Sequence, residues 1–153
     1  MNTIHNILVA IGTKLQCLLL LVIRLYFGWQ IMHIGWGKLT HLDATTKYFA
    51  TLPYVGHAPE FNVILAGLAE TVGGILLLLG LWSRFGALAL VFTMLVAYVT
   101  AEPAALHAFF SNPDKFTGAD PFLFFAAALL VFCFGPGKIA IDSLIFKNSA
   151  SGK

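Results

Sequence analysis

The sequence predicts an all-α protein, an integral membrane four-helix bundle. Hydrophobic residues make up 59% of its 153 residues, whereas Asp, Glu, Lys and Arg together make up only 10%. Soluble domains average about 25% charged residues, so nine basic and seven acidic side chains are too few to cover a soluble globule. The net charge of +2 gives no basic footprint of the kind that binds nucleic acid. We expect one membrane domain, residues 1–153, whose partner is the lipid bilayer and not a nucleic acid.

Four apolar stretches account for the predicted spans. A bilayer-crossing helix needs about 20 consecutive apolar residues, and the stretches that approach this length are 15–36, 61–82, 85–101 and 121–137. Arg24 interrupts the first and Glu70 the second, while the third and fourth carry no charge. Pro121 is typical of a first helical position, and Gly135-Pro136-Gly137 breaks the fourth stretch. The runs are continuous rather than alternating, which favours helices over a β-barrel.

The segments at the two ends of the chain are amphipathic. Apolar residues recur at helical spacing before Lys14, at Ile4, Ile7, Leu8 and Ile11. This pattern predicts a short N-terminal helix that lies on the membrane surface. After the Gly-Pro-Gly break, we expect a broken C-terminal amphipathic segment.

The distribution of basic residues predicts the orientation of the chain. One side of the predicted membrane carries Lys14, Arg84, Lys138, Lys147 and Lys153. The opposite side carries Lys38, Lys47 and Lys115. Cytoplasmic loops are enriched in Lys and Arg. We therefore expect a multi-pass protein of the plasma or inner membrane with both termini in the cytoplasm.

Two charges inside the spans mark the main candidate site. Counted from the ends of their stretches, Arg24 and Glu70 both fall near the middle of the bilayer, where an isolated charge costs at least ~2.5–3.5 kcal/mol. We predict that they form an ion pair facing the bundle interior, because pairing offsets much of this cost. Gly28 follows Arg24 by four residues and Gly74 follows Glu70 by four. Glycines on these faces would let the two helices approach closely.

The Arg24–Glu70 pair has two interpretations. It is either a clip that fixes the register of two helices, or a site that binds a ligand headgroup or exchanges protons. Arg24 cannot release a proton, so only Glu70 could take part in proton exchange. The residues assign no catalytic group, and an enzyme and a protein without chemistry of its own both remain open.

Other polar residues form weaker candidate sites. Arg84 and Asp142 are expected to pair at the cytoplasmic face, and Lys38 to extend its ammonium to the outer membrane boundary. We expect no metal site. Only His33 lies in a predicted span, and His41, His57 and His107 lack a recognisable ligand spacing.

Three segments follow one another in a recognisable order: RLYFGWQIMHIGWGKL from Arg24, ETVGGILLLLGLWSR from Glu70, and FGPGKIAIDSL at the end of the fourth stretch. In this order they resemble the DoxX family of small four-helix bacterial membrane proteins. The resemblance implies recurring polar positions at Arg24, Lys38, Glu70, Arg84 and Asp142. It also implies a link to quinone-coupled oxidation, since a DoxD-like relative is a subunit of a thiosulfate:quinone oxidoreductase. The family often places Ser directly before Leu-Asp, and this chain departs from that order around Asp142.

The resemblance and the buried charges together suggest an accessory subunit or membrane anchor of a quinone-linked redox system. A quinone near Arg24 and Glu70 is the suggested cofactor, and a redox protein is the suggested partner. The first alternative is a small proton-coupled transporter in which Glu70 is the switching carboxylate. The second is a structural or assembly partner. The sequence assigns no oligomeric state.

Overall fold

The computed structural model describes residues 2–145. This part of the chain consists of helices joined by irregular segments, and it contains no strand. Its helices are α1 (Asn2–Thr40), α2 (Leu42–Ala50), α3 (Pro59–Leu79), α4 (Ser83–Thr100), α5 (Pro103–His107), α6 (Pro113–Thr117), α7 (Pro121–Phe134) and α8 (Ile141–Ile145). Three of them, α1, α3 and α4, are long and apolar enough to cross a membrane. The prediction of an all-helical, multi-pass membrane protein is therefore confirmed.

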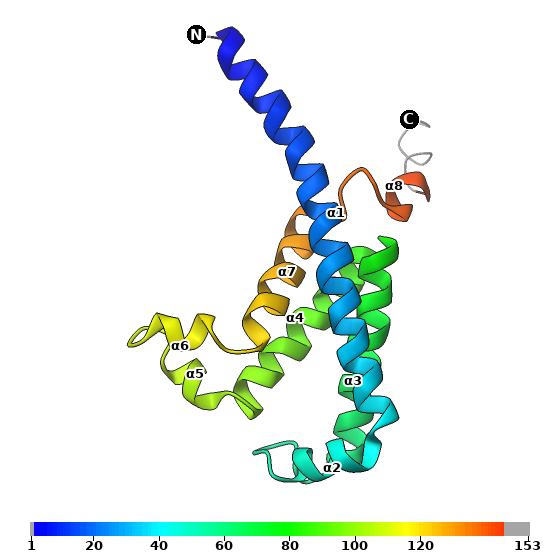
Figure 1. Ribbon diagram of the computed structural model, residues 1–153, viewed down its shortest axis with the longest axis vertical. Coiled ribbons are helices and arrows are strands. Elements are labelled where there is room, and N and C mark those ends of the chain that lie inside the picture. The colour runs from blue at the N-terminus through cyan, green and yellow to red at the C-terminus, as the bar shows by residue number, and fades with distance from the viewer. Residues whose placement is uncertain (1, 146–153) are drawn as a thin grey trace.

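The first helix is much longer than a bilayer requires. It has 39 residues, or roughly 58 Å at about 1.5 Å per residue, against a hydrocarbon core of about 30 Å. Residues 3–16 are exposed throughout, and Leu20 is the first buried residue. The prediction of a separate surface helix is wrong. No proline or left-handed residue interrupts the chain between Asn2 and Thr40, so the helix continues without a break (Figure 1).

The long helices alternate in direction and share one core. α1 packs along α3, and α4 packs against α3 on one side and α7 on the other. The buried residues at the centre are Ile31, Leu77, Ala87, Leu90, Met94, Ala128 and Val131. Large apolar side chains such as Leu25, Val72 and Leu123 point outward and are exposed, as expected of a surface that faces lipid. In lipid such a core is stabilised mainly by close packing, because the surroundings are also apolar.

The fourth helix of the bundle is shorter than predicted. α7 has 14 residues, or about 21 Å, and the predicted stretch 121–137 ends as a helix at Phe134. Pro121 occupies the start of α7 as expected. Gly135 ends it with a φ of +78° and Gly137 has a φ of +80°, a region that favours glycine. The predicted break after α7 is confirmed, while α7 alone does not reach the length of a full span.

The two ends of the bundle carry different elements. α2 lies at the end of the bundle opposite α8, and α5 and α6 extend to one side (Figure 1). The Tyr98 ring stacks on Phe116 with centroids 4.7 Å apart, and its hydroxyl donates to the Phe116 carbonyl at 2.9 Å. These contacts tie the α5–α6 segment to the end of α4.

Candidate functional site

Glycines bring α1 and α3 into backbone contact. A Cβ on Gly74 would lie 2.8 Å from the carbonyl oxygen of Gly28, and a Cβ on Gly67 would lie 3.2 Å from that of Gly35. The two glycines of each helix are seven residues apart, so both pairs lie on one seam. The predicted close approach at Gly28 and Gly74 is confirmed, and it fixes the register that positions the buried charges.

The Arg24 side chain is buried at the end of the bundle that carries α8, and only 2% of its surface is exposed. Its Nε donates to the carbonyl of Leu77 at 2.9 Å, and its Nη2 donates to Leu78 at 3.4 Å. Its Nη1 donates to Pro136 at 2.5 Å and to Ile139 at 3.0 Å. The last carbonyls of a helix lack partners within the helix and lie at the negative end of its dipole. Arg24 therefore closes the end of α3 and holds the loop after α7.

The predicted Arg24–Glu70 ion pair is wrong. The Arg24 guanidinium reaches the carbonyls of Leu77 and Leu78, seven and eight residues from Glu70 on α3, or about 10–12 Å along the helix. Helical side chains lean toward the N-terminus of their own helix. In this antiparallel pair Arg24 leans toward one end of the bundle and Glu70 toward the other.

Glu70 instead pairs with Lys38. The Lys38 ammonium lies 2.5 Å from Glu70 Oε1, with 25% of the Lys38 side chain exposed against 3% for Glu70. Lys38, which the sequence places at the outer membrane boundary, turns its ammonium toward Glu70, because each of the two side chains points toward the N-terminus of its own helix in this antiparallel pair. The other oxygen, Glu70 Oε2, is buried and has no hydrogen-bond partner among residues 2–145.

The Lys38–Glu70 pair lines a cavity of about 340 Å³ between α2, α3 and α4. Most of its wall is apolar. Ligand-binding cavities typically measure about 300–1,000 Å³ and combine apolar walls with a few polar groups. The residues that give this cavity its chemistry are Lys38, Tyr48, Phe49, Asn62, Glu70 and Thr93. We call it the Glu70 cavity.

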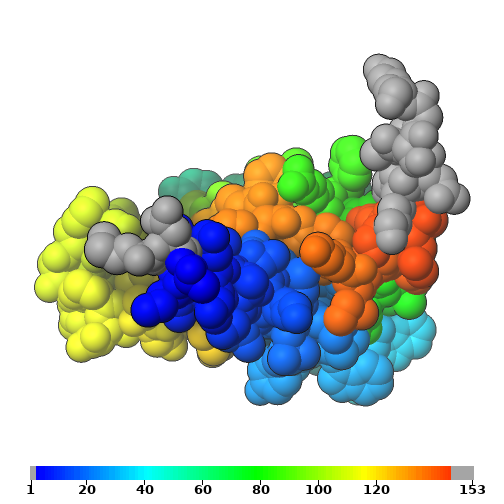
Figure 2. Space-filling model, turned by 90° about the horizontal axis from the view of Figure 1, so that it is seen from above, coloured from blue at the N-terminus to red at the C-terminus, as the bar shows by residue number. Residues whose placement is uncertain are grey.

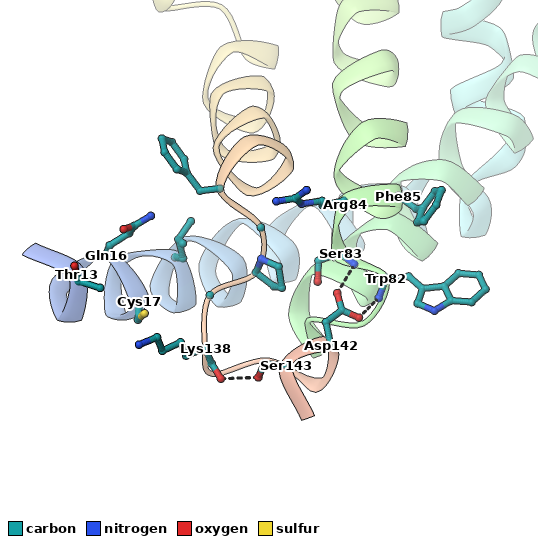
Figure 3. A pocket seen from close by; sticks show the side chains of 15 residues that line it. Thr13, Gln16, Cys17, Trp82, Ser83, Arg84, Phe85, Lys138, Asp142 and Ser143 are labelled. Carbon is teal, nitrogen blue, oxygen red and sulfur yellow. Dashed lines mark hydrogen bonds between the residues drawn. The ribbon is translucent and has the colours of Figure 1, made fainter. Parts of the chain in front are cut away.

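At the α8 end, Asp142 has a different partner from the one predicted. Its carboxylate accepts the backbone N–H groups of Trp82 at 2.7 Å and Ser83 at 2.9 Å, the N-cap and the first residue of α4. A carboxylate is stabilised there by the helix dipole. Arg84 points away, toward the Gly135 backbone (Figure 3). The expected Arg84–Asp142 pair is therefore wrong, although both residues do lie at the same end of the bundle.

The family model for DoxX matches residues 19–103, more than half of the chain. The chain belongs to the DoxX family. No curated protein and no solved structure matches it.

In this DoxX protein, the matched region holds most of the candidate site. It includes both buried charges, the glycine seam and the walls of the Glu70 cavity. The loop that Arg24 holds and the Asp142 carboxylate lie after residue 103. Within residues 2–145, no group of three or more His, Cys, Asp or Glu side chains comes together as a metal site would require.

The sequence alone did not identify the residues of α2 and α4 that line the Glu70 cavity. Tyr48, Phe49 and Thr93 line the Glu70 cavity, but each lies in a segment whose apolar character resembles ordinary packing. Thr93 donates its hydroxyl to the Ala89 carbonyl at 2.9 Å, so its polarity is partly used within the helix. The feature of the sequence that could have indicated this cavity is Asn62, a polar residue on the charged face of α3.

Proposed function

We propose that this DoxX protein binds a quinone or quinol in the Glu70 cavity and acts as an accessory membrane subunit of a quinone-linked redox system. The observation that carries the proposal is the buried Glu70 carboxylate, whose Oε2 has no hydrogen-bond partner among residues 2–145, on the wall of an apolar cavity among membrane-spanning helices. Arg24 is not part of the proposed quinone site, because its donors are occupied by carbonyl groups.

The chemistry of the cavity fits both redox forms of such a ligand. The Lys38 ammonium is a hydrogen-bond donor that suits a quinone carbonyl, whereas Glu70 Oε2 is an acceptor that suits a quinol hydroxyl. Tyr48, Phe49 and Phe92 supply aromatic wall against which a quinone ring can pack. A polar headgroup with an apolar tail also matches a cavity that lies among lipid-facing helices.

The cellular setting is part of the same proposal. We place the protein in the plasma or inner membrane with both termini in the cytoplasm, because Lys14, Arg84 and Lys138 gather toward the α8 end of the bundle. The chain provides a membrane anchor and a quinone site, and a partner protein provides electron transfer.

Quinone titration of the purified protein tests the proposal. With decyl-substituted benzoquinone as the probe, Glu70→Leu and Lys38→Met should each raise Kd at least about tenfold, the effect of losing one charged hydrogen bond of about 1.5 kcal/mol. The matched controls are Glu60→Gln on α3 and Lys47→Met on α2, both at exposed positions. The controls should keep the wild-type Kd. Absence of binding to the wild type, or equal binding by all five proteins, would contradict the proposal.

A proton-coupled transporter is the second candidate function. The observation that favours it is again Glu70, whose Oε2 has no partner in the described part of the chain and which lies midway along a spanning helix. Proton flux into liposomes separates the two functions. A transporter requires a flux that Glu70→Gln abolishes, whereas a quinone subunit gives quinone binding without such a flux.

A further inference from the structure

A second and larger cavity lies at the α8 end of the bundle. It measures about 880 Å³ and is bounded by α1, the first turn of α4, the loop after α7 and α8 (Figure 3). The residues that give it polar character are Thr13, Gln16, Ser83, Arg84, Lys138 and Asp142. The quinone proposal does not use this cavity.

The charges around this cavity favour an anion. Arg84 and Lys138 line it, and among residues 2–145 neither forms an ion pair. The single acid, Asp142, already accepts two backbone N–H groups. The Ser83 hydroxyl is fully buried and has no partner in the described part of the chain. Arg and Lys donors in this arrangement suit the oxygens of a phosphate group.

An apolar groove continues from the cavity along the membrane-facing surface. It measures about 710 Å³ and lies between α1 and α7, which are side by side in the view from above (Figure 2). Gln16, Leu20 and Phe134 line both the cavity and the groove. A ligand that occupies both must have a polar head and an apolar chain.

Exposed aromatic residues place the cavity at the level of lipid headgroups. Trp82, Phe85 and Phe134 line it, with 61%, 73% and 60% of their surfaces exposed. Aromatic side chains of this kind gather where a membrane meets water, and basic pockets between membrane helices bind anionic lipid headgroups. We infer that this cavity binds the phosphate headgroup of an anionic phospholipid, with an acyl chain in the α1–α7 groove.

Lipid selectivity tests the headgroup part of this inference. The full chain in mild detergent is titrated with dioleoyl phosphatidylglycerol and, separately, dioleoyl phosphatidylcholine, and bound lipid is counted by native mass spectrometry. Phosphatidylglycerol should bind about tenfold more tightly. Combining Arg84→Gln with Lys138→Gln should remove this preference, whereas Lys47→Gln with Lys115→Gln, at exposed positions away from the cavity, should keep it. Equal binding of the two lipids by the wild type, or a preference that survives the first pair of changes, would overturn the inference.

A groove-filling change tests the acyl-chain part and leaves both cations in place. Val22 lines the groove on the bilayer side of the cavity and is 53% exposed, whereas Val72 on α3 is 50% exposed and lies outside the groove. Val22→Trp should weaken dioleoyl phosphatidylglycerol binding at least about fivefold and leave dihexanoyl phosphatidylglycerol unaffected, while Val72→Trp should change neither. Unchanged dioleoyl binding by Val22→Trp would contradict the groove. Inorganic phosphate that competes as well as the lipid would overturn the inference in favour of a soluble anion.

Discussion

The two buried charges of this protein, Arg24 and Glu70, differ in how fully their hydrogen-bonding capacity is used. Both are 2% exposed. Arg24 donates four hydrogen bonds to carbonyls of α3 and the loop after α7, whereas Glu70 uses one oxygen and leaves the other without a partner in the described chain. Burial alone therefore does not separate a structural charge from a functional one. The unused capacity of Glu70, beside a cavity, separates them.

The difference also predicts which charge the fold depends on. Removing Arg24 takes the donor from the part-buried carbonyls of Leu78, Pro136 and Ile139, and a buried carbonyl without a donor costs about 1–3 kcal/mol. Removing Glu70 leaves only Lys38, whose side chain is 25% exposed and can turn toward the membrane surface. The fold therefore depends on the hydrogen bonds of Arg24, whereas Glu70 can be replaced without loss of the fold.

The largest expected effect is a loss of protein stability on replacement of Arg24. Arg24→Leu should lower the free energy of unfolding by about 3 kcal/mol or more, because the carbonyls of Leu78, Pro136 and Ile139 lose the guanidinium donor. Thermal unfolding in detergent measures this loss, with Lys47→Leu as an exposed control. A variant as stable as the control would show that Arg24 is not needed to hold the loop.

The next effect is at the glycine seam that sets the level of both charges. A Cβ on Gly35 would lie 2.6 Å from the backbone nitrogen of Thr71, and backbone atoms cannot yield without moving the helix. Gly35→Ala should therefore destabilise the protein by about 1–3 kcal/mol. Gly37→Ala, two residues away in open space, is the matched control. Equal melting temperatures for the two variants would contradict the close seam.

A smaller effect is expected at Asp142, which fastens α8 to α4. Asp142→Ala removes the acceptor for the N–H groups of Trp82 and Ser83, and Trp82 holds a left-handed φ of +45°. Loss of a helix-capping carboxylate costs about 1 kcal/mol. The midpoint of chemical unfolding measures it, with Asp43→Ala, an exposed position on α2, for comparison. If Asp43→Ala costs as much, the cap contributes nothing specific.

The sequence predicted the helices and the buried charged residues correctly, but it did not predict which charged side chains pair with one another. Continuous apolar runs identify α1, α3 and α4. Gly28 and Gly74, four residues after Arg24 and Glu70, indicate where α1 and α3 approach closely. Pairing depends on the register of α1 against α3, which Gly35 and Gly67 set together with Gly28 and Gly74. Applying the N-terminal lean of helical side chains to that register would have turned Glu70 toward Lys38 and away from Arg24.

Two other features depended on tertiary structure. The length of α1 could not be read from hydropathy, because residues 3–16 are amphipathic and resemble a separate surface helix in the sequence. The Glu70 cavity is built from α2, α3 and α4, so no single segment of the chain encodes it.

Thermal unfolding with and without decyl-substituted benzoquinone tests the central distinction most directly, when applied to the wild type, Arg24→Leu and Glu70→Leu. The account predicts that quinone raises the Tm of the wild type, since a ligand that binds the folded state stabilises it. Glu70→Leu should keep a Tm near the wild-type value and lose the quinone-dependent rise, whereas Arg24→Leu should lose much of its stability even without quinone. A Glu70→Leu protein that retains the full rise, or that unfolds as readily as Arg24→Leu, would contradict the account.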